Sequence, residues 1–280
     1  MARTGLPERL GALAVAACIS LALLLGTSPP PVLSTPPALG TAGTAGHAKL
    51  VPHRSGPAAT AKTALLVGDS QSAGAANVPG HRTLTQSALR ASGYDVQFVG
   101  AGGIGFVASN GSGSPNYPTS LNQGRWALPS GAPALVVIEG GGNDARTGAT
   151  DAQILQGADA TVQALHHRYP TSRMLMIGTL SGARSPAGSR RAEVDRLLGN
   201  YARTRQIAFV GAGDWLARYG LVSHLADDVH LTQDGHDLLA GILATRLATL
   251  HLGHKDTTAT LSATVPATVP ANAQAVDPQR

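Results

Sequence analysis

Three residues in this chain could together perform nucleophilic chemistry. Ser70 stands in the segment Gly-Asp-Ser-Gln, and Asp227 precedes His230 by three residues. A serine hydroxyl becomes a nucleophile when a base accepts its proton, and a neutral imidazole can serve first as base and then as acid. A carboxylate on the other ring nitrogen fixes the tautomer and stabilises the imidazolium. The pattern predicts acyl transfer, with Ser70 as nucleophile, His230 as base and Asp227 as the residue that orients His230.

Acyl transfer also requires donors for the negative charge that develops on the acyl oxygen. The side-chain amide of Asn143, which follows three glycines, is one candidate donor. The backbone N–H groups of Ser70 and Gly105 are two more. Gly102 and Gly103 are close enough to compete with Gly105, so the sequence leaves the choice among these three glycines open.

Each of these residues also has an ordinary structural interpretation. Ser70 would suit the start of a helix, and Asn143 would suit a turn. The neighbouring Asp69 and Asp144 are expected to bond loop amides and hold the turns. An Asp three residues before a His is common by itself, so the prediction depends on the combination.

A rival interpretation comes from Gly100, Gly102 and Gly105, whose spacing matches the dinucleotide-binding fingerprint. The segment that follows, residues 108–115, is rich in Ser, Gly and Asn and cannot form the helix that would hold a pyrophosphate. Gly-x-Ser-x-Gly and Walker motifs are absent, and the ten histidines lack His-Glu-x-x-His spacing. We therefore expect no organic cofactor and no metal.

Apolar runs alternate with helical patterns between residues 62 and 252, which predicts a βαβ series. Its strands are expected at Ala64–Val67, Val96–Val99, Ala134–Ile138, Met174–Ile177 and Ile207–Val210, and its helices at Ala152–Arg168, Arg190–Arg205 and Gln233–Leu250. The implied fold is α/β, with a parallel sheet of about five strands covered on both faces. Ligands bind such sheets at the carboxyl ends of the strands, where the polar segments fall.

The charge balance argues against nucleic acid as a partner. The chain of 280 residues has a formal net charge of +5, but residues 62–252 hold 15 Lys and Arg against 13 Asp and Glu. The excess lies mostly before residue 62, and the arginines of the central region are spread out with few aromatic residues among them. The single cysteine excludes a disulfide framework.

Composition divides the chain into four parts. Residues 1–26 carry two arginines followed by a 16-residue apolar run, which predicts a signal peptide or signal anchor. The run is shorter than the roughly 20 residues of a spanning helix, which favours cleavage. Residues 27–61 are expected to form a Pro/Ala/Gly-rich linker, 62–252 the catalytic domain and 253–280 a disordered tail. We expect a monomer that is secreted or associated with the cell envelope, touching a membrane only through an N-terminal anchor.

The polar segments together resemble the SGNH hydrolases, also called GDSL-type esterases and lipases, over roughly residues 62–252. The family's Gly-Asp-Ser-Leu block is matched around Ser70, with Gln71 in place of the usual Leu at a position expected to do no chemistry. Its Gly-x-Asn-Asp block is matched around Asn143, and its Asp-x-x-His block ends at His230. The glycine of the family's second block maps best to Gly105.

The resemblance implies a flavodoxin-like three-layer α/β/α sandwich and hydrolysis of carboxylic esters through an acyl-enzyme, without metal or organic cofactor. A small-molecule or glycan ester with a short acyl or acetyl group is the expected substrate. The loop from Val107 to Leu128, with Tyr117 and Trp126, is interpreted as a sugar-facing or open rim. An acyltransferase on the same fold and a non-catalytic glycan-binding module remain alternatives, and acyl length, alcohol part and leader cleavage stay open.

Overall fold

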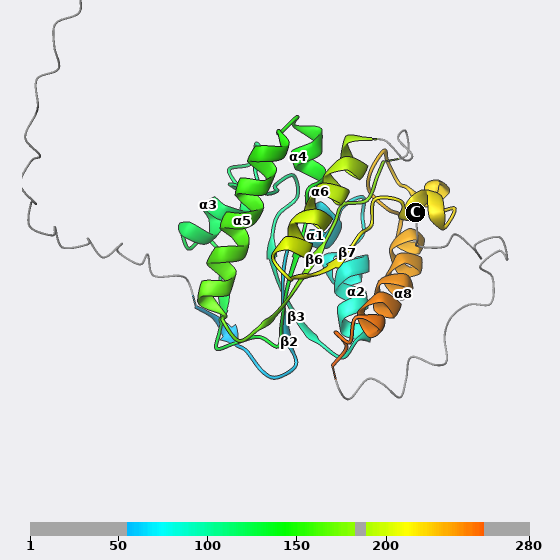
Figure 1. Cartoon of the computed structure of the whole chain (residues 1–280). Coiled ribbons are helices and arrows are strands. Elements are labelled where there is room, and N and C mark those ends of the chain that lie inside the picture. Colours follow the sequence, from blue (N-terminus) through cyan, green and yellow to red (C-terminus); the bar gives the residue numbers. More distant parts are fainter. Residues whose placement is uncertain (1–54, 183–188, 255–280) are drawn as a thin grey trace, which may run out of the picture. The chain divides into compact units, whose positions relative to one another are not determined.

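The computed structural model describes residues 55–182 and 189–254 (Figure 1). The predicted signal peptide or anchor, most of the predicted linker, and all but the first two residues of the predicted tail lie outside these residues. Within the described ranges, no helix is long and apolar enough to cross a membrane.

A parallel sheet of five strands forms the centre of the described region, in the order β3-β2-β5-β6-β7. The strands are β2 (Thr63–Gly68), β3 (Asp95–Gly100), β5 (Leu135–Glu139), β6 (Arg173–Ile177) and β7 (Ala208–Val210). Val67 pairs with Val99 on one side and Ile138 on the other, so the carboxyl ends of the first three strands meet at one edge. The predicted α/β fold with five strands is confirmed.

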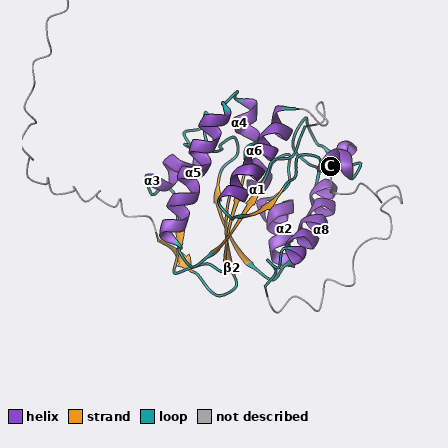
Figure 2. Cartoon of the chain, in the orientation of Figure 1, coloured by secondary structure: helices purple, strands orange, loops and turns teal. Residues whose placement is uncertain are grey.

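Helices cover both faces of this sheet and create two apolar cores (Figures 1 and 2). Side chains alternate along β2, so Leu66 enters one core and Leu65 the other. The first core is closed by α2 (Leu84–Ala91) and α8 (Gln233–Thr249), and the second by α5 (Asp151–Arg168) and α6 (Arg190–Thr204). This arrangement is the expected three-layer sandwich.

Shorter helices follow the strands or lie in the connecting loops. They are α1 (Ser70–Ala73), α3 (Tyr117–Asn122), α4 (Gly142–Arg146) and α7 (Trp215–Arg218), with single 3₁₀ turns at Gly80–Arg82 and Val222–His224. Because α1 and α4 begin directly after β2 and β5, their first residues lie at the carboxyl edge of the sheet.

Two expectations about segments outside the main sheet are wrong. The linker does not extend to residue 61, because β1 (Ser55–Ala58) pairs in parallel with β4 (Leu128–Ser130) in a separate two-stranded sheet. Tyr117 does not line a sugar-facing rim, because it is fully buried in edge-to-face contact with Phe106. Its hydroxyl donates to the backbone carbonyl of Glu139 at 2.9 Å, which makes it a core residue.

Candidate active site

Ser70 lies where β2 ends and α1 begins. Asp69 caps this helix, since its Oδ1 accepts a hydrogen bond from the N–H of Gln71 at 2.9 Å. The extended backbone at Asp69 turns the chain out of the sheet, so Ser70 stands at the carboxyl edge of a central strand. The serine therefore opens the helix, while the capping side chain belongs to Asp69.

The segment that carries Asp227 and His230 is a tight loop before α8. Asp227 Oδ1 accepts hydrogen bonds from the N–H groups of Val229 at 2.8 Å and His230 at 2.7 Å. The bases of the loop are joined by an antiparallel bridge between Leu225 and Leu231. This turn brings the Asp227 carboxylate beside the His230 ring, as the three-residue spacing predicted.

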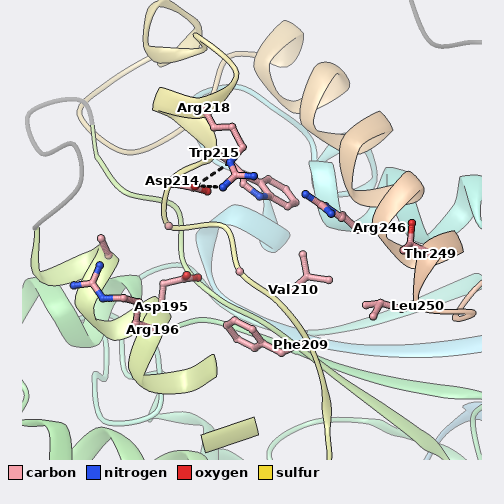
Figure 3. Close-up of a pocket in the computed structure, with 13 residues that line it drawn as sticks. Asp195, Arg196, Phe209, Val210, Asp214, Trp215, Arg218, Arg246, Thr249 and Leu250 are labelled. Atoms are coloured by element: carbon pink, nitrogen blue, oxygen red, sulfur yellow. Dashed lines mark hydrogen bonds and ion pairs between the residues drawn. The ribbon is translucent and has the colours of Figure 1, made fainter. Parts of the chain in front are cut away.

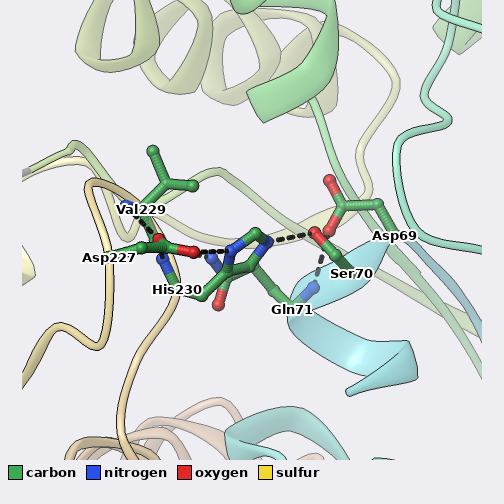
Figure 4. A network of polar contacts seen from close by, with 6 residues as sticks. All are labelled: Asp69, Ser70, Gln71, Asp227, Val229 and His230. Atoms are coloured by element: carbon green, nitrogen blue, oxygen red, sulfur yellow. Dashed lines mark hydrogen bonds and ion pairs between the residues drawn. The ribbon is translucent and has the colours of Figure 1, made fainter. Parts of the chain in front are cut away.

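The structure brings Ser70, His230 and Asp227 into one line (Figure 4). His230 Nε2 lies 2.9 Å from Ser70 Oγ, and His230 Nδ1 lies 2.7 Å from Asp227 Oδ2. With Asp227 ionised, Nδ1 carries the proton that it donates to the carboxylate, which leaves Nε2 free to accept from Ser70. The arrangement can move a proton from the serine to the imidazole.

Hydrogen bonds keep Asp227 charged over a wide pH range. Partial burial acts to raise its pKa, but donation from the His230 ring and from the N–H groups of His230 and Val229 lowers that pKa to about 2. The Asp227 side chain is about half exposed, at 51%, whereas that of His230 is 24% exposed. The imidazole is thus sheltered and its carboxylate partner faces solvent.

Asn143 approaches the serine from the neighbouring strand. It lies in α4, and the chain turns from β5 into this helix at Gly141, whose φ of +106° is in the left-handed region that favours glycine. Asn143 is buried, and its Nδ2 donates to Asp69 Oδ2 and to the carbonyl of Ile104, both at 3.0 Å. The amide is therefore tied to the residue before Ser70.

In this structure the N–H of Gly105, the predicted oxyanion-hole donor, already has a hydrogen-bond partner. This N–H donates to the carbonyl of Ala108 at 2.9 Å, and a Cβ built on Gly105 would lie 2.5 Å from Asp144 Oδ2. Gly105 thus packs against a buried carboxylate. Gly102 is the glycine beside the nucleophile, since a Cβ built on it would lie 3.6 Å from the Cβ of Ser70.

Asp144 holds the loop that follows β3. Its buried carboxylate accepts hydrogen bonds from the N–H groups of Phe106 at 3.0 Å and of Val107 and Ala108 at 2.8 Å. The expectation that Asp69 and Asp144 bond loop amides is confirmed. Because Asp144 follows Asn143 directly, one short helix fixes both the amide and the glycine loop.

Glu139 is a further buried acid near the site, in addition to Asp69 and Asp144, and sequence reasoning missed it. Glu139 ends β5, and its Oε2 accepts hydrogen bonds from Ser72 Oγ at 2.8 Å and from the N–H of Asp69 at 3.3 Å. Burial and the nearby Asp69 carboxylate raise the pKa of Glu139 well above its usual value, and burial raises that of Asp69 to about 6. A lone acid at the end of an apolar strand was the available signal.

Neither of two pockets in the described region is lined by Ser70, His230 or Asp227. One of about 260 Å³ lies between α4 and the His230 loop, and Arg146, Arg191 and Val229 are among its lining residues. Another of about 480 Å³ lies beside β7 and is lined by residues such as Phe209 and Trp215 (Figure 3), but by none of the aligned triple. Among the described residues, no three His, Cys, Asp or Glu side chains are arranged to hold a metal.

Comparison with known proteins matches this region to one family. Residues 66–238 match the model of the GDSL-like Lipase/Acylhydrolase family. Esterase TesA from Pseudomonas aeruginosa is 35% identical over 122 residues, which is 43% of this chain and 55% of that esterase. The alignment therefore spans about half the length of this curated relative.

Solved structures share the architecture. A crystal structure of TesA superposes with a TM-score of 0.50 at 28% identity, covering 67% of this chain and 99% of that one. A family two carbohydrate esterase from Clostridium thermocellum in complex with cellohexaose gives a TM-score of 0.56 at 15% identity, covering 70% of this chain and 66% of that one. At that identity the second match shows the fold alone.

Proposed function

This chain belongs to the GDSL-like lipase/acylhydrolase family, and we propose that it hydrolyses carboxylic esters through an acyl-enzyme formed on Ser70. The observation that carries the proposal is the continuous contact from Ser70 through His230 to Asp227 at the carboxyl edge of the sheet. Family membership and the esterase relative support the reaction class.

In the first half-reaction, Ser70 Oγ bonds to the acyl carbon while its proton passes to His230 Nε2. The C–O bond to the alcohol then breaks, and His230 returns the proton to the leaving oxygen. In the second half-reaction, water attacks the acyl carbon while its proton passes to His230 Nε2, the bond from that carbon to Ser70 Oγ breaks, and His230 returns the proton to Ser70. Asp227 stays ionised and stabilises the imidazolium, which its low pKa supports.

The N–H groups of Ser70 and Gly102 are the proposed backbone donors to the oxyanion. Neither forms a hydrogen bond within the described part of the chain, and the two residues are adjacent in space. Asn143 is the third proposed donor. Its Nδ2 hydrogens now point to Asp69 and Ile104, so donation to the acyl oxygen requires one of these bonds to be exchanged.

The proposed substrate is a small ester with a short acyl or acetyl group, carried by a glycan or another small alcohol. The pocket of about 260 Å³ is lined by Asp228 and Val229 of the loop that carries His230, though not by Ser70, and its size suits a small part of the ester rather than a long chain. Similarity to a carbohydrate esterase fold supports the glycan part. We also propose that residues 1–26 direct export and that 27–54 link this leader to the domain.

The test is hydrolysis of p-nitrophenyl acetate and butyrate by the full chain and by Ser70→Ala and His230→Ala variants. Loss of the nucleophile or base is expected to lower kcat by at least about 10³-fold. His224→Ala, a histidine outside the aligned triple, is the matched control and should retain activity. Equal nitrophenol release by all variants, or fluorophosphonate labelling at a residue other than Ser70, would overturn the proposal.

A further inference from the structure

Gln71 is the residue next to the nucleophile, and its side chain reaches the loop that carries the base. Gln71 is buried in α1, and its N–H is held by Asp69 Oδ1 at 2.9 Å. Its Nε2 donates to the backbone carbonyl of Val229 at 2.7 Å, across 158 positions of sequence. This position is usually Leu in the family, and the sequence predicts no chemistry for it.

The bonded carbonyl belongs to the same peptide unit as the N–H of His230. That N–H donates to Asp227 Oδ1 at 2.7 Å, while the carbonyl oxygen at the other side of the unit accepts from Gln71. Because a peptide unit is planar, hydrogen bonds at both sides fix its orientation. The Cα of His230 lies in this plane, so the point from which its side chain leaves the backbone is fixed as well.

The loop itself is exposed, which makes a link to the body of the protein important for its position. Asp227 and Asp228 are exposed, and Val229 and His230 are only partly buried. Gln71 connects this loop to the helix that begins with Ser70 (Figure 4). One side chain therefore relates the backbone of the base to the backbone of the nucleophile.

The energetic cost of burying the Gln71 side chain also indicates a role for it beyond packing. Its Oε1 is buried and has no hydrogen-bond partner among the described residues. A buried acceptor without a partner destabilises a fold, and an apolar side chain at this position would avoid that cost. Stability alone therefore does not favour glutamine at this position. The need for a hydrogen-bond donor to the Val229 carbonyl does favour glutamine.

We propose that Gln71 is a positioning residue for the ester hydrolysis proposed above: its bond to Val229 holds the His230 backbone so that Nε2 meets Ser70 Oγ. This inference rests on the proposed function for its effect on turnover. The bond and its effect on the loop can be measured without turnover.

Two variants remove the donor while keeping the size of the side chain. Gln71→Met preserves its length, and Gln71→Leu introduces the residue usual in the family. Both are expected to lower kcat on p-nitrophenyl acetate by about ten- to a hundredfold because the reacting atoms are misplaced, and KM should change less than kcat. The NMR order parameters of the Val229 and His230 N–H bonds should be lower in both variants than in the unsubstituted chain, where a rigid backbone gives about 0.85.

Gln86→Met is the matched control. Gln86 is also buried, and its Nε2 donates to a backbone carbonyl, that of Ser72, at 2.9 Å, but it does not touch the His230 loop. Its kcat should stay within about twofold of the unsubstituted chain, and the loop order parameters should not change. A kcat for Gln71→Met within twofold, or unchanged order parameters, would overturn the inference.

The same experiment separates the two proposals. If the unsubstituted chain neither turns over an ester nor labels with a fluorophosphonate, the proposed function fails, and the order parameters alone decide whether Gln71 holds the loop. If the unsubstituted chain is active and Gln71→Met is equally active, the function stands and the role of Gln71 is rejected.

Discussion

At the scale of single residues, the site depends on which way each backbone N–H points. Gly105 has the sequence position expected of an oxyanion donor, but its N–H is taken by Ala108 and its Cα packs on Asp144. Gly102 stands beside Ser70 and has negative φ, so it can adopt its conformation without being glycine. The two glycines should therefore respond differently to a methyl group.

We expect Gly102→Ala to lower activity and Gly105→Ala to lower stability. The new methyl at position 102 would make an ordinary contact with Ser70, so stability should change by less than about 0.5 kcal/mol. It would also narrow the space above the serine, and kcat/KM should fall about tenfold. The methyl at position 105 would lie 2.5 Å from Asp144 Oδ2, which should cost about 1–3 kcal/mol.

Urea unfolding and ester hydrolysis on the same preparations measure both effects. If Gly105→Ala lost activity at full stability while Gly102→Ala was unaffected, Gly105 would be the donor after all.

The serine, histidine and aspartate were predictable because their residue types and spacing define their chemistry. The choice of Gly102 among the three candidate glycines, and the roles of Gln71 and Glu139, could not be predicted, since they come from contacts that only the folded chain creates.

At the scale of elements, the long helices were predictable to within one residue at each end. Each has a local signal: Thr150, Ser189 and Thr232 cap α5, α6 and α8 through their side chains. The sheet followed from apolar runs in the same way. Because neighbouring residues determine these features, they can be recognised from the sequence pattern.

Helix α2 and strand β1 are missing from the sequence prediction for different reasons. Helix α2 is short, but it carries a local signal, since Leu84, Ala88 and Leu89 form a buried apolar face at helical spacing. Strand β1 lies in a Pro/Gly-rich stretch and forms because β4, some 70 residues later, offers its backbone. In β1, long-range pairing overrides composition.

Glycines inside helices provide the prediction at this scale. Gly157 in α5 lies against the loop after β3, where an added Cβ would be 2.3 Å from the carbonyl oxygen of Phe106. Gly241 in α8 has nothing within 4 Å of such a Cβ. We expect Gly241→Ala to raise the free energy of unfolding by about 0.5–1 kcal/mol, as helix propensity dictates. Gly157→Ala should lower it by about 1–3 kcal/mol because the helix and loop must separate.

Urea denaturation of the two variants checks this pair, with each serving as the control for the other. Changes of the same sign would show that helix propensity, and not the close approach of Phe106 to Gly157, decides the effect. A neutral Gly157→Ala would show that the loop relaxes without cost.

At the scale of the whole molecule, the net charge says little about the described domain. The excess of basic residues lies mostly before residue 62, while the domain buries several acids. Asp195 is one of them: it is 9% exposed and accepts a hydrogen bond from the N–H of Ala212 at 2.9 Å. Burial raises the pKa values of Asp195 and Asp69 to about 6, and it raises that of Glu139 well above its usual value.

These raised values make stability depend on pH in a definite direction. In the unfolded chain an Asp loses its proton near pH 3.8, so between there and about pH 6 the folded chain holds more protons. The free energy of unfolding therefore falls as pH rises from about 4 to about 6, and stays lower above that. His236 opposes this trend, because burial lowers its pKa to about 4. Its contribution to the free energy of unfolding therefore rises as pH rises from about 4 to about 6.5.

Asp195→Asn should flatten this dependence. The amide oxygen can still accept from Ala212 but carries no charge to bury, so the variant should match the unsubstituted chain near pH 4. At pH 7.5 it should be more stable by about 1–2 kcal/mol.

Urea unfolding at pH 4, 5, 6 and 7.5 measures the difference, with the exposed Asp95→Asn as control. A constant offset between the two curves at every pH would mean that Asp195 carries the same charge in both states. Because Asp195 lies in α6 beside the β7 pocket and outside the Ser70 site, the change in stability should leave kcat at pH 7.5 unaltered.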